Sequence, residues 1–175
     1  MNWIDKLLVA SYLKTRDETA FKLLYRRHAK AMWVIAFNMV QGNRPEAEEI
    51  TQDAWMRAIK GLDRFEWKSS LRTWLLAIVV NRCKEAYRSR KAFVDLDAVD
   101  NTHSIHPSDE LELYDAHQLI RSLPTGYRTI LILHDLEGYQ HDEIAAILDI
   151  APGTSKSQLH QARKAFRKLY DHQQQ

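Results

Sequence analysis

Cysteine, glycine and proline are all scarce in this 175-residue sequence, which contains one, five and four of them respectively. A single cysteine, Cys83, excludes an internal disulfide framework and suits a reducing compartment. Because few residues break helices and the apolar side chains recur at intervals of three and four, the sequence predicts helices rather than strands. We therefore expect an all-α fold.

Long apolar runs are also absent. No segment approaches the ~20 consecutive apolar residues that a membrane-spanning helix requires. The first residues, MNWIDKLLVASYLKTRD, have apolar positions at helical spacing, but Asp5 and Lys6 interrupt them, so they lack the continuous apolar region of a signal peptide. We expect a cytoplasmic protein that does not insert into a membrane.

Basic residues are missing from one stretch of the chain. Between Lys91 and Arg121 there is no lysine or arginine, although the formal net charge of the whole chain is +2. The acids of this stretch are Asp95, Asp97, Asp100, Asp109, Glu110, Glu112 and Asp115. Residues 93–107 show no helical period, so they are predicted to be an acidic linker. Two small helical domains, residues 1–92 and 108–175, are expected on either side of it.

Helix boundaries can be predicted from capping residues and from the few helix breakers. Thr15 and Glu18 have the spacing of a capping box, which would start a long helix ending near Gly42. Further helices are predicted from Pro45 to Gly61, from Leu71 to about Lys91, from Ser108 to about Ser122, from Pro124 to Leu136, and over about 140–148 and 154–170.

The last two predicted helices have the spacing of a helix-turn-helix, whose second helix enters the major groove of duplex DNA by its N-terminal end. That end carries short polar residues: Thr154, Ser155, Lys156, Ser157, Gln158 and, one turn later, Gln161. Lysine can donate to guanine and glutamine can read adenine, while the cations that follow can bind phosphates. The alternative is a basic, solvated surface helix without a ligand.

Two features of the first domain suggest partners. The segment 63–70 places Phe65 and Trp67 beside cations, a combination that can stack on unpaired bases, although Phe65 and Trp74 also suit a core. The helix from Pro45 carries an acidic surface made of Glu46, Glu48, Glu49, Gln52 and Asp53. Acids repel DNA, so this surface would face a protein, or it only complements the dipole of its helix.

Taken in order, these pieces resemble the extracytoplasmic-function (ECF) class of bacterial RNA polymerase sigma factors. The first domain matches at FKLLYRRH (21–28), EEITQDAWMRAIKGLDRF (48–65) and SSLRTWLLAIVVN (69–81). The second matches at SLPTGYRTILILHDLEGYQHDEIAAILDIAPGTSKSQLHQARKAF (122–166). The resemblance implies a region 2-like bundle and a region 4-like helix-turn-helix domain. It also implies a transcription initiation factor without catalytic activity or a cofactor.

The resemblance also implies which residues bind which partner. Core RNA polymerase, through its β′ clamp and β subunits, would be bound by Glu49, Gln52, Asp53 and Arg57. The −10 promoter element would be bound by Phe65, Glu66, Trp67, Lys68, Ser69, Ser70, Asn81 and Arg88. The −35 element would be bound by Thr154, Lys156, Ser157, Gln158, His160, Gln161, Arg163 and Lys164. The family commonly has an anti-sigma partner, and its linker threads into the polymerase cleft.

The sequence departs from the family pattern at several of these positions. Ser155 and Gln158 replace a valine and an arginine that are frequent in the recognition helix, and Gln161 replaces a cation. Fewer phosphate contacts predict a gentler dependence of binding on salt. Asp149 stands where the turn usually has glycine, which aspartate tolerates because it can adopt a left-handed conformation. Trp67 also replaces a glycine.

Two other functions compete with this interpretation. One is a stand-alone helix-turn-helix regulator, which would bind an operator as a dimer without polymerase. The other is a metal site formed by His103, His106, Asp109 and Glu110, whose spacing could supply ligands. His134 and His141 are expected to lie too far apart, on separate elements, to strengthen such a site, and we expect no metal.

Overall fold

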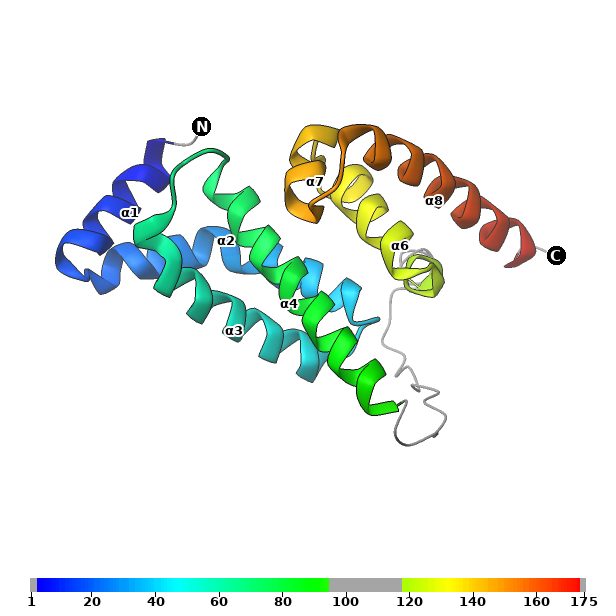
Figure 1. Cartoon of the computed structure of the whole chain (residues 1–175), viewed down its shortest axis with the longest axis horizontal. Helices are drawn as coiled ribbons and strands as arrows, with labels where there is room; N and C mark the ends of the chain where they lie inside the picture. The colour runs from blue at the N-terminus through cyan, green and yellow to red at the C-terminus, as the bar shows by residue number, and fades with distance from the viewer. Residues whose placement is uncertain (1–2, 95–117, 174–175) are drawn as a thin grey trace.

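The computed structural model describes residues 3–94 and 118–173, and every regular element in these ranges is helical (Figure 1). The elements are α1 (Trp3–Thr15), α2 (Glu18–Met39), α3 (Arg44–Gly61), the 3₁₀-helix η1 (Leu62–Arg64), α4 (Leu71–Val94), α6 (Thr125–Leu131), the π-helix η2 (Ile132–Leu136), α7 (His141–Leu148) and α8 (Pro152–Gln173). Residues 118–122 are helical as well. The all-α prediction is confirmed.

The predicted capping box at Thr15 is wrong. Thr15 is the last residue of α1, and its hydroxyl donates to the carbonyl oxygen of Ser11 at 3.1 Å. Arg16 then adopts a left-handed conformation with φ of 54°, which breaks the helix. The carboxylate of Asp17 instead accepts a hydrogen bond from the backbone N–H of Thr19 at 2.8 Å. Asp17 is therefore the N-cap of α2. Thr15 cannot take this role, because α1 extends as far as Thr15.

Other boundaries agree with the sequence. Asn43 caps α3 and Pro45 lies in its first turn, as predicted. Helix α4 continues to Val94, so the first two residues of the predicted linker are helical. The rest of that linker, the predicted cap at Ser108 and the alternative metal ligands at 103–110 lie outside the described residues.

Helices α1 to α4 form the first helical group, in which α2, α3 and α4 pack on one another and α1 packs on α2 (Figure 1). The residues at the centre of the group are apolar and less than 4% exposed: Leu24, Met32, Ile35, Ile50, Leu75 and Val79. Each such side chain contributes roughly 1.5–3 kcal/mol when it is removed from water. The apolar residues that recur at helical spacing in the sequence are therefore the ones that are buried in the structure.

The second helical group consists of residues 118–173. Ile130, Leu133, Ile144, Ile147 and Leu159 are each at most 4% exposed and join α6, η2, α7 and α8. This second core contains leucine and isoleucine but no tryptophan, as the distribution of aromatic residues in the sequence indicated.

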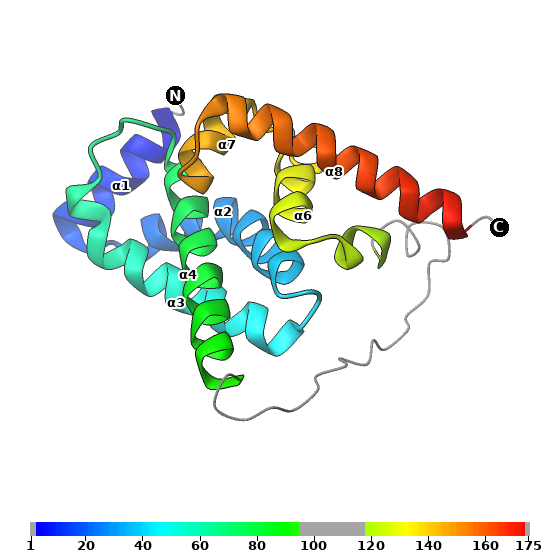
Figure 2. The ribbon, with the colours of Figure 1, turned by 45° about the vertical axis from the view of Figure 1, so that its right-hand side comes forward.

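The two helical groups pack directly against each other. Figure 2 shows α7 beside α4, and α6 also contacts α2. The Lys84 ammonium donates to the carbonyl oxygen of Leu148 at 2.9 Å, and the Arg121 guanidinium lies 5.3 Å from the ring centre of Phe37. Buried residues of both groups belong to one continuous apolar core. The two helical groups are therefore separate segments of the sequence that are joined through one apolar interface.

Arg128 is a fully buried cation at this interface. Its guanidinium donates to the carbonyl oxygen of Arg121 at 2.5 Å and to the hydroxyl of Thr125 at 3.0 Å. A longer contact, 3.5 Å, reaches the carbonyl oxygen of Met39 on α2. Burial lowers the pKa of Arg128 to about 10, so the group stays protonated at neutral pH. It joins the start of α6 to the end of α2.

We expect the free energy of unfolding to decrease as the pH falls below about 6.5, in part because of His28. Its side chain is 5% exposed, and burial holds its pKa below the usual value of 6.5, although Asp5 lies 3.2 Å away. The unfolded chain therefore takes up a proton that the folded chain resists, which destabilises the fold at low pH. Urea unfolding at pH 7.5 and 5.5 measures the effect.

The variant His28→Gln should lose less stability between these two pH values than the wild type. His172→Gln is the matched control, because His172 is exposed near the end of α8. An unchanged pH dependence in His28→Gln would show that other groups cause the decrease.

Candidate nucleic-acid interface

The helix-turn-helix predicted from the sequence is formed by α7 and α8. The backbone N–H of Gln140 donates to the Glu143 carboxylate at 3.0 Å at the start of α7. Asp149 ends α7 in a left-handed conformation with φ of 57° and ψ of 56°, as expected for the residue that replaces glycine. Helix α8 begins at Pro152, earlier than predicted. Leu159 and Ala162 are buried and hold α8 on the second helical group.

Most of the predicted −35 contacts lie on the outer surface of α8. Lys156, Ser157, His160, Gln161, Arg163 and Lys164 are exposed, and Thr154 and Gln158 are half-buried. Ser155 differs, because it is fully buried and its Oγ lies 2.9 Å from Nδ1 of His141. The valine of the family pattern is thus replaced by a serine that stays inside and bonds to α7.

Arg163 is held by an acid on η2. Its Nη2 and Nε donate to the two carboxylate oxygens of Asp135 at 2.6 and 3.0 Å. These bonds lower the pKa of Asp135, so the pair is charged at neutral pH. The pair is exposed, and its geometry fixes the direction of the guanidinium on one side of α8.

His134 and His141 are close together, so the expectation that they lie far apart is wrong. Their ring centres are 4.7 Å from each other, because the turn at Gly138 brings the start of α7 back to η2. Partial burial and the nearby basic side chains of His134, Lys156 and Arg163 lower the pKa of His141. Nowhere in residues 3–94 and 118–173 do three or more potential ligands gather around a metal position.

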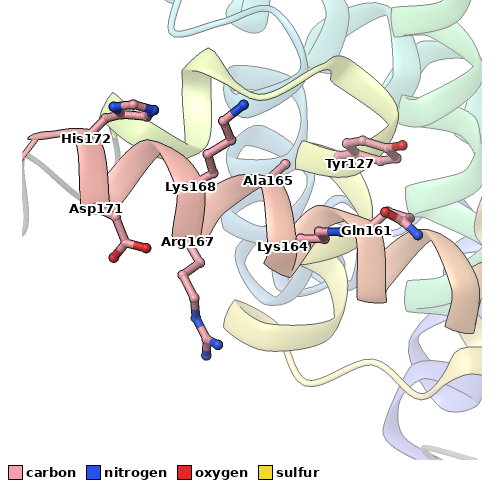
Figure 3. Close-up of a pocket in the computed structure, with 8 residues that line it drawn as sticks. All are labelled: Tyr127, Gln161, Lys164, Ala165, Arg167, Lys168, Asp171 and His172. Atoms are coloured by element: carbon pink, nitrogen blue, oxygen red, sulfur yellow. The ribbon is translucent and has the colours of Figure 1, made fainter.

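A groove lies between α6 and the C-terminal half of α8, and two of the predicted −35 residues line it. Figure 3 shows Gln161 and Lys164 on the side of α8 that faces Tyr127 of α6. The groove is lined by Tyr127, Gln161, Lys164, Ala165, Arg167, Lys168, Asp171 and His172. Lys156, His160 and Arg163 are not among these residues, but His160 lies four residues before Lys164 and is therefore its neighbour on the helix surface.

The aromatic rings of the loop 65–70 are half-buried, in agreement with the core role that the sequence left open for Phe65. Phe65 stacks on Trp74 with ring centres 4.8 Å apart, and Trp67 lies at the same distance from Phe65. The Lys6 ammonium of α1 lies 5.5 Å from the Trp67 ring centre. Trp67 has φ of 58°, and its ring packs against the first helical group. Glu66 and Lys68 are the exposed side chains of this loop.

On α4, the predicted −10 contacts Asn81 and Arg88 are both exposed. They are seven residues apart, which is about two helical turns, so they lie on the same side of the helix. Ser70 caps this helix, since its Oγ accepts from the backbone N–H of Thr73 at 3.0 Å. The loop 65–70 therefore leads directly into the helix that carries Asn81 and Arg88.

The predicted polymerase-binding surface on α3 contains an ion-pair network. The Arg57 Nε lies 3.3 Å from Asp53, and its Nη1 lies 3.2 Å from Glu85 on α4. Arg82 also pairs with both Asp53 and Glu85. Arg82 and Glu85 were not among the predicted residues, although their spacing of three residues on a helix indicates such a pair. Glu49 and Gln52 are exposed beside the network.

Comparisons with known protein families match segments that include both helical groups. Residues 24–93 match the family described as Sigma-70 region 2, and residues 113–166 match Sigma-70, region 4. The chain is 32% identical over 172 residues to the ECF RNA polymerase sigma factor SigW of Bacillus subtilis, which covers 89% of this chain and 91% of SigW. It is 31% identical over 180 residues to the ECF RNA polymerase sigma-E factor of Escherichia coli K12, covering 93% and 92% of the two chains.

Two solved structures have a similar fold. The sigma factor RpoE of Bartonella quintana, in complex with the anti-sigma factor NepR, aligns with a TM-score of 0.76 and 28% identity over 86% of this chain and 96% of RpoE. CnrH, in complex with the cytosolic domain of CnrY, aligns with a TM-score of 0.73 and 25% identity over 97% and 98% of the two chains.

The fold and the helix-turn-helix define a DNA-binding transcription initiation factor built from two helical groups. The chain belongs to the family of ECF RNA polymerase sigma factors. Members of this family direct RNA polymerase to promoters and are not enzymes. A stand-alone regulator is not favoured, because the first helical group matches sigma region 2. Among the described helices, none has the length and apolar character to cross a membrane.

We expect the variant Trp67→Gly to be more stable than Trp67→Ala by about 1 kcal/mol, because a left-handed residue other than glycine is strained. Both variants lose the packing of the ring on Phe65, so their difference isolates the backbone at φ of 58°. Urea unfolding of the two variants measures this difference. Equal stabilities would contradict the strain.

Proposed function

We propose that this sigma factor divides promoter recognition between two domains, residues 1–92 and 108–175, which carry the first and the second helical group, with residues 93–107 as the connection. The exposed polar start of α8 is the observation that carries the proposal, because a helix-turn-helix reads the major groove by that end. Lys156, Ser157 and Gln158 would contact the −35 element there, together with Thr154 and His160. The protein would act in the cytoplasm, where polymerase and DNA are found.

The sides of α8 would have different roles at the −35 element. Arg163, whose guanidinium is oriented by Asp135, is suited to a phosphate on one side of the recognition helix. Gln161 and Lys164 lie on the side of α8 that faces α6. From that side they would reach the other strand of the DNA. These contacts position the helix, whereas Lys156 and Gln158 carry the sequence preference.

The first helical group would hold the −10 element as a single strand. Asn81 and Arg88 share one side of α4, and the loop 65–70 lies before the start of the same helix. Extracting a base from the stack costs a few kcal/mol, which the loop and the polymerase must offset. Since Phe65 and Trp67 are packed inward, Glu66, Lys68, Ser69 and Ser70 supply the polar contacts.

Core RNA polymerase would bind the outer surface of α3, through Glu49, Gln52, Asp53 and Arg57. The ion pairs of Asp53 and Arg57 with α4 support this proposal, because they fix two of the four side chains before a partner arrives. The contacts are expected on the β′ clamp, with further contacts to β. An anti-sigma factor is a further expected partner, since RpoE and CnrH were each solved in complex with another protein.

The first experiment is a titration of the labelled protein against purified bacterial core RNA polymerase, in competition with a known sigma factor. We expect tight, competable binding that Glu49→Lys weakens at least several-fold. Glu18→Lys is the control, because Glu18 is an exposed acid at the start of α2 and is not one of the residues proposed to bind polymerase. Failure of the wild-type protein to bind, while folded, would overturn the proposal.

The −35 assignment is tested by selecting promoters from a randomised library with polymerase that carries the protein. Gln158→Ala should change the preferred −35 sequence while leaving the −10 sequence and the polymerase affinity unchanged. Deleting α8 is a poorer test, because Leu159 and Ala162 are part of the core. An unchanged −35 preference would remove Gln158 from the recognition surface.

A further inference from the structure

Arg72 stands at the junction of the two helical groups. It is the second residue of α4, two positions after Ser70, which ends the loop 65–70 and caps the helix. Ser70 Oγ also lies 2.8 Å from the hydroxyl of Thr73. Any strand held by the loop would therefore pass close to Arg72. The residue was not among those predicted to contact DNA.

In the packed structure, the Arg72 side chain contacts two residues of the second helical group. Its Nη2 donates to the carboxylate of Glu137 at 2.8 Å, and its guanidinium lies 5.2 Å from the ring centre of Tyr139. Within the described part of the chain, no acid of the first group forms an ion pair with Arg72. Its Nε is buried without a hydrogen-bond partner, so its donors are only partly used.

Arg72 also lines a cavity of about 440 Å³ with Asp5, Arg27, His28 and Ser70. Asp5 is the acid of this cavity, and it already accepts from Arg27 at 2.9 Å and contacts His28 at 3.2 Å. Without Glu137, the two arginines outnumber the single carboxylate. The cavity then has a net positive charge and a hydroxyl donor, which is the chemistry that binds a phosphate.

Promoter binding requires the two groups to separate. Elements near −35 and −10 are about 25 base pairs apart, which is about 85 Å at 3.4 Å per base pair. Helix α7 contacts α4 in the packed structure, so the two groups cannot reach both elements in this arrangement. Separation removes Glu137 and Tyr139 from Arg72 and leaves its guanidinium beside the loop.

We propose that Arg72 is a further DNA-contacting residue, which binds a backbone phosphate of the unpaired strand held by the loop 65–70. Glu137 masks this residue while the two groups are packed. The inference rests on the proposed function, because it assumes that the loop holds the −10 element. Single-stranded DNA fits better than an acidic protein segment, because Ser70, a residue of the loop 65–70, lines the same cavity as Arg72 and Arg27.

Two variants separate masking from DNA binding. Arg72→Gln and Glu137→Gln remove the same ion pair, so each should tighten binding of core polymerase by a similar factor, up to about fivefold. Only Arg72→Gln also removes the phosphate contact. Arg44→Gln is the matched control, because Arg44 forms an exposed ion pair with Glu48 within α3.

The DNA step is measured with the assembled polymerase and the promoter recovered from the selection, with its −10 region held open by mismatches. Arg72→Gln should weaken binding and reduce the slope of log K against log salt by about 0.7, as expected for one lost contact to a single strand. Glu137→Gln and Arg44→Gln should keep the wild-type slope.

Different failures have different meanings. If the wild-type protein does not bind core polymerase, the proposed function fails. If it binds, and Arg72→Gln has the same salt slope and DNA affinity as Glu137→Gln, only the role of Arg72 is overturned. Because Arg72→Gln also loses the contact with Tyr139, urea unfolding of both variants checks that each is folded under the conditions of the binding measurement.

Discussion

The burial of α4 on three sides is the constraint on which the rest of the structure depends. Leu75 and Val79 face α2 and α3, while the other side of the helix is covered by α7. Asn81 and Arg88 are among the α4 residues that stay exposed. The same helix carries Ser70 at its start and Glu85 in the network with α3. The candidate DNA and polymerase surfaces are therefore fixed relative to each other by one element.

Ion pairs hold exposed charged side chains in orientations that helix packing alone would not fix. Asp53 and Arg57 on α3 are tied to Arg82 and Glu85 on α4, and Arg163 on α8 is tied to Asp135. Exposed pairs of this kind contribute little to stability, typically less than about 1 kcal/mol each. Their effect here is geometric, because they hold charged side chains in one orientation before a partner binds.

The helical fold could be predicted from the sequence because burial follows the helical period, as at Met32 and Ile35 on α2. The Asp149 turn was also predictable, because a left-handed residue between two helices has a local signature. The start of α2 was not, since Thr15 and Asp17 both have cap chemistry and only the length of α1 decides between them. The packing of Phe65 on Trp74 agrees with the core role that the sequence left open for both residues. The contact of Trp67 with Lys6 could not be predicted, because Lys6 lies on a different helix.

The sequence by itself determined the all-α fold class, the helix-turn-helix and the family, because these depend on local spacing and on motifs read along the chain. It did not indicate the 3₁₀-helix η1 or the π-helix η2. The tertiary structure alone decided that His134 meets His141, that Gln161 and Lys164 line a groove with Tyr127, and that Arg72 is paired with Glu137. These contacts join residues on different elements, up to 65 positions apart. Such pairs are set by how the helices pack, and no local pattern in the sequence records that packing.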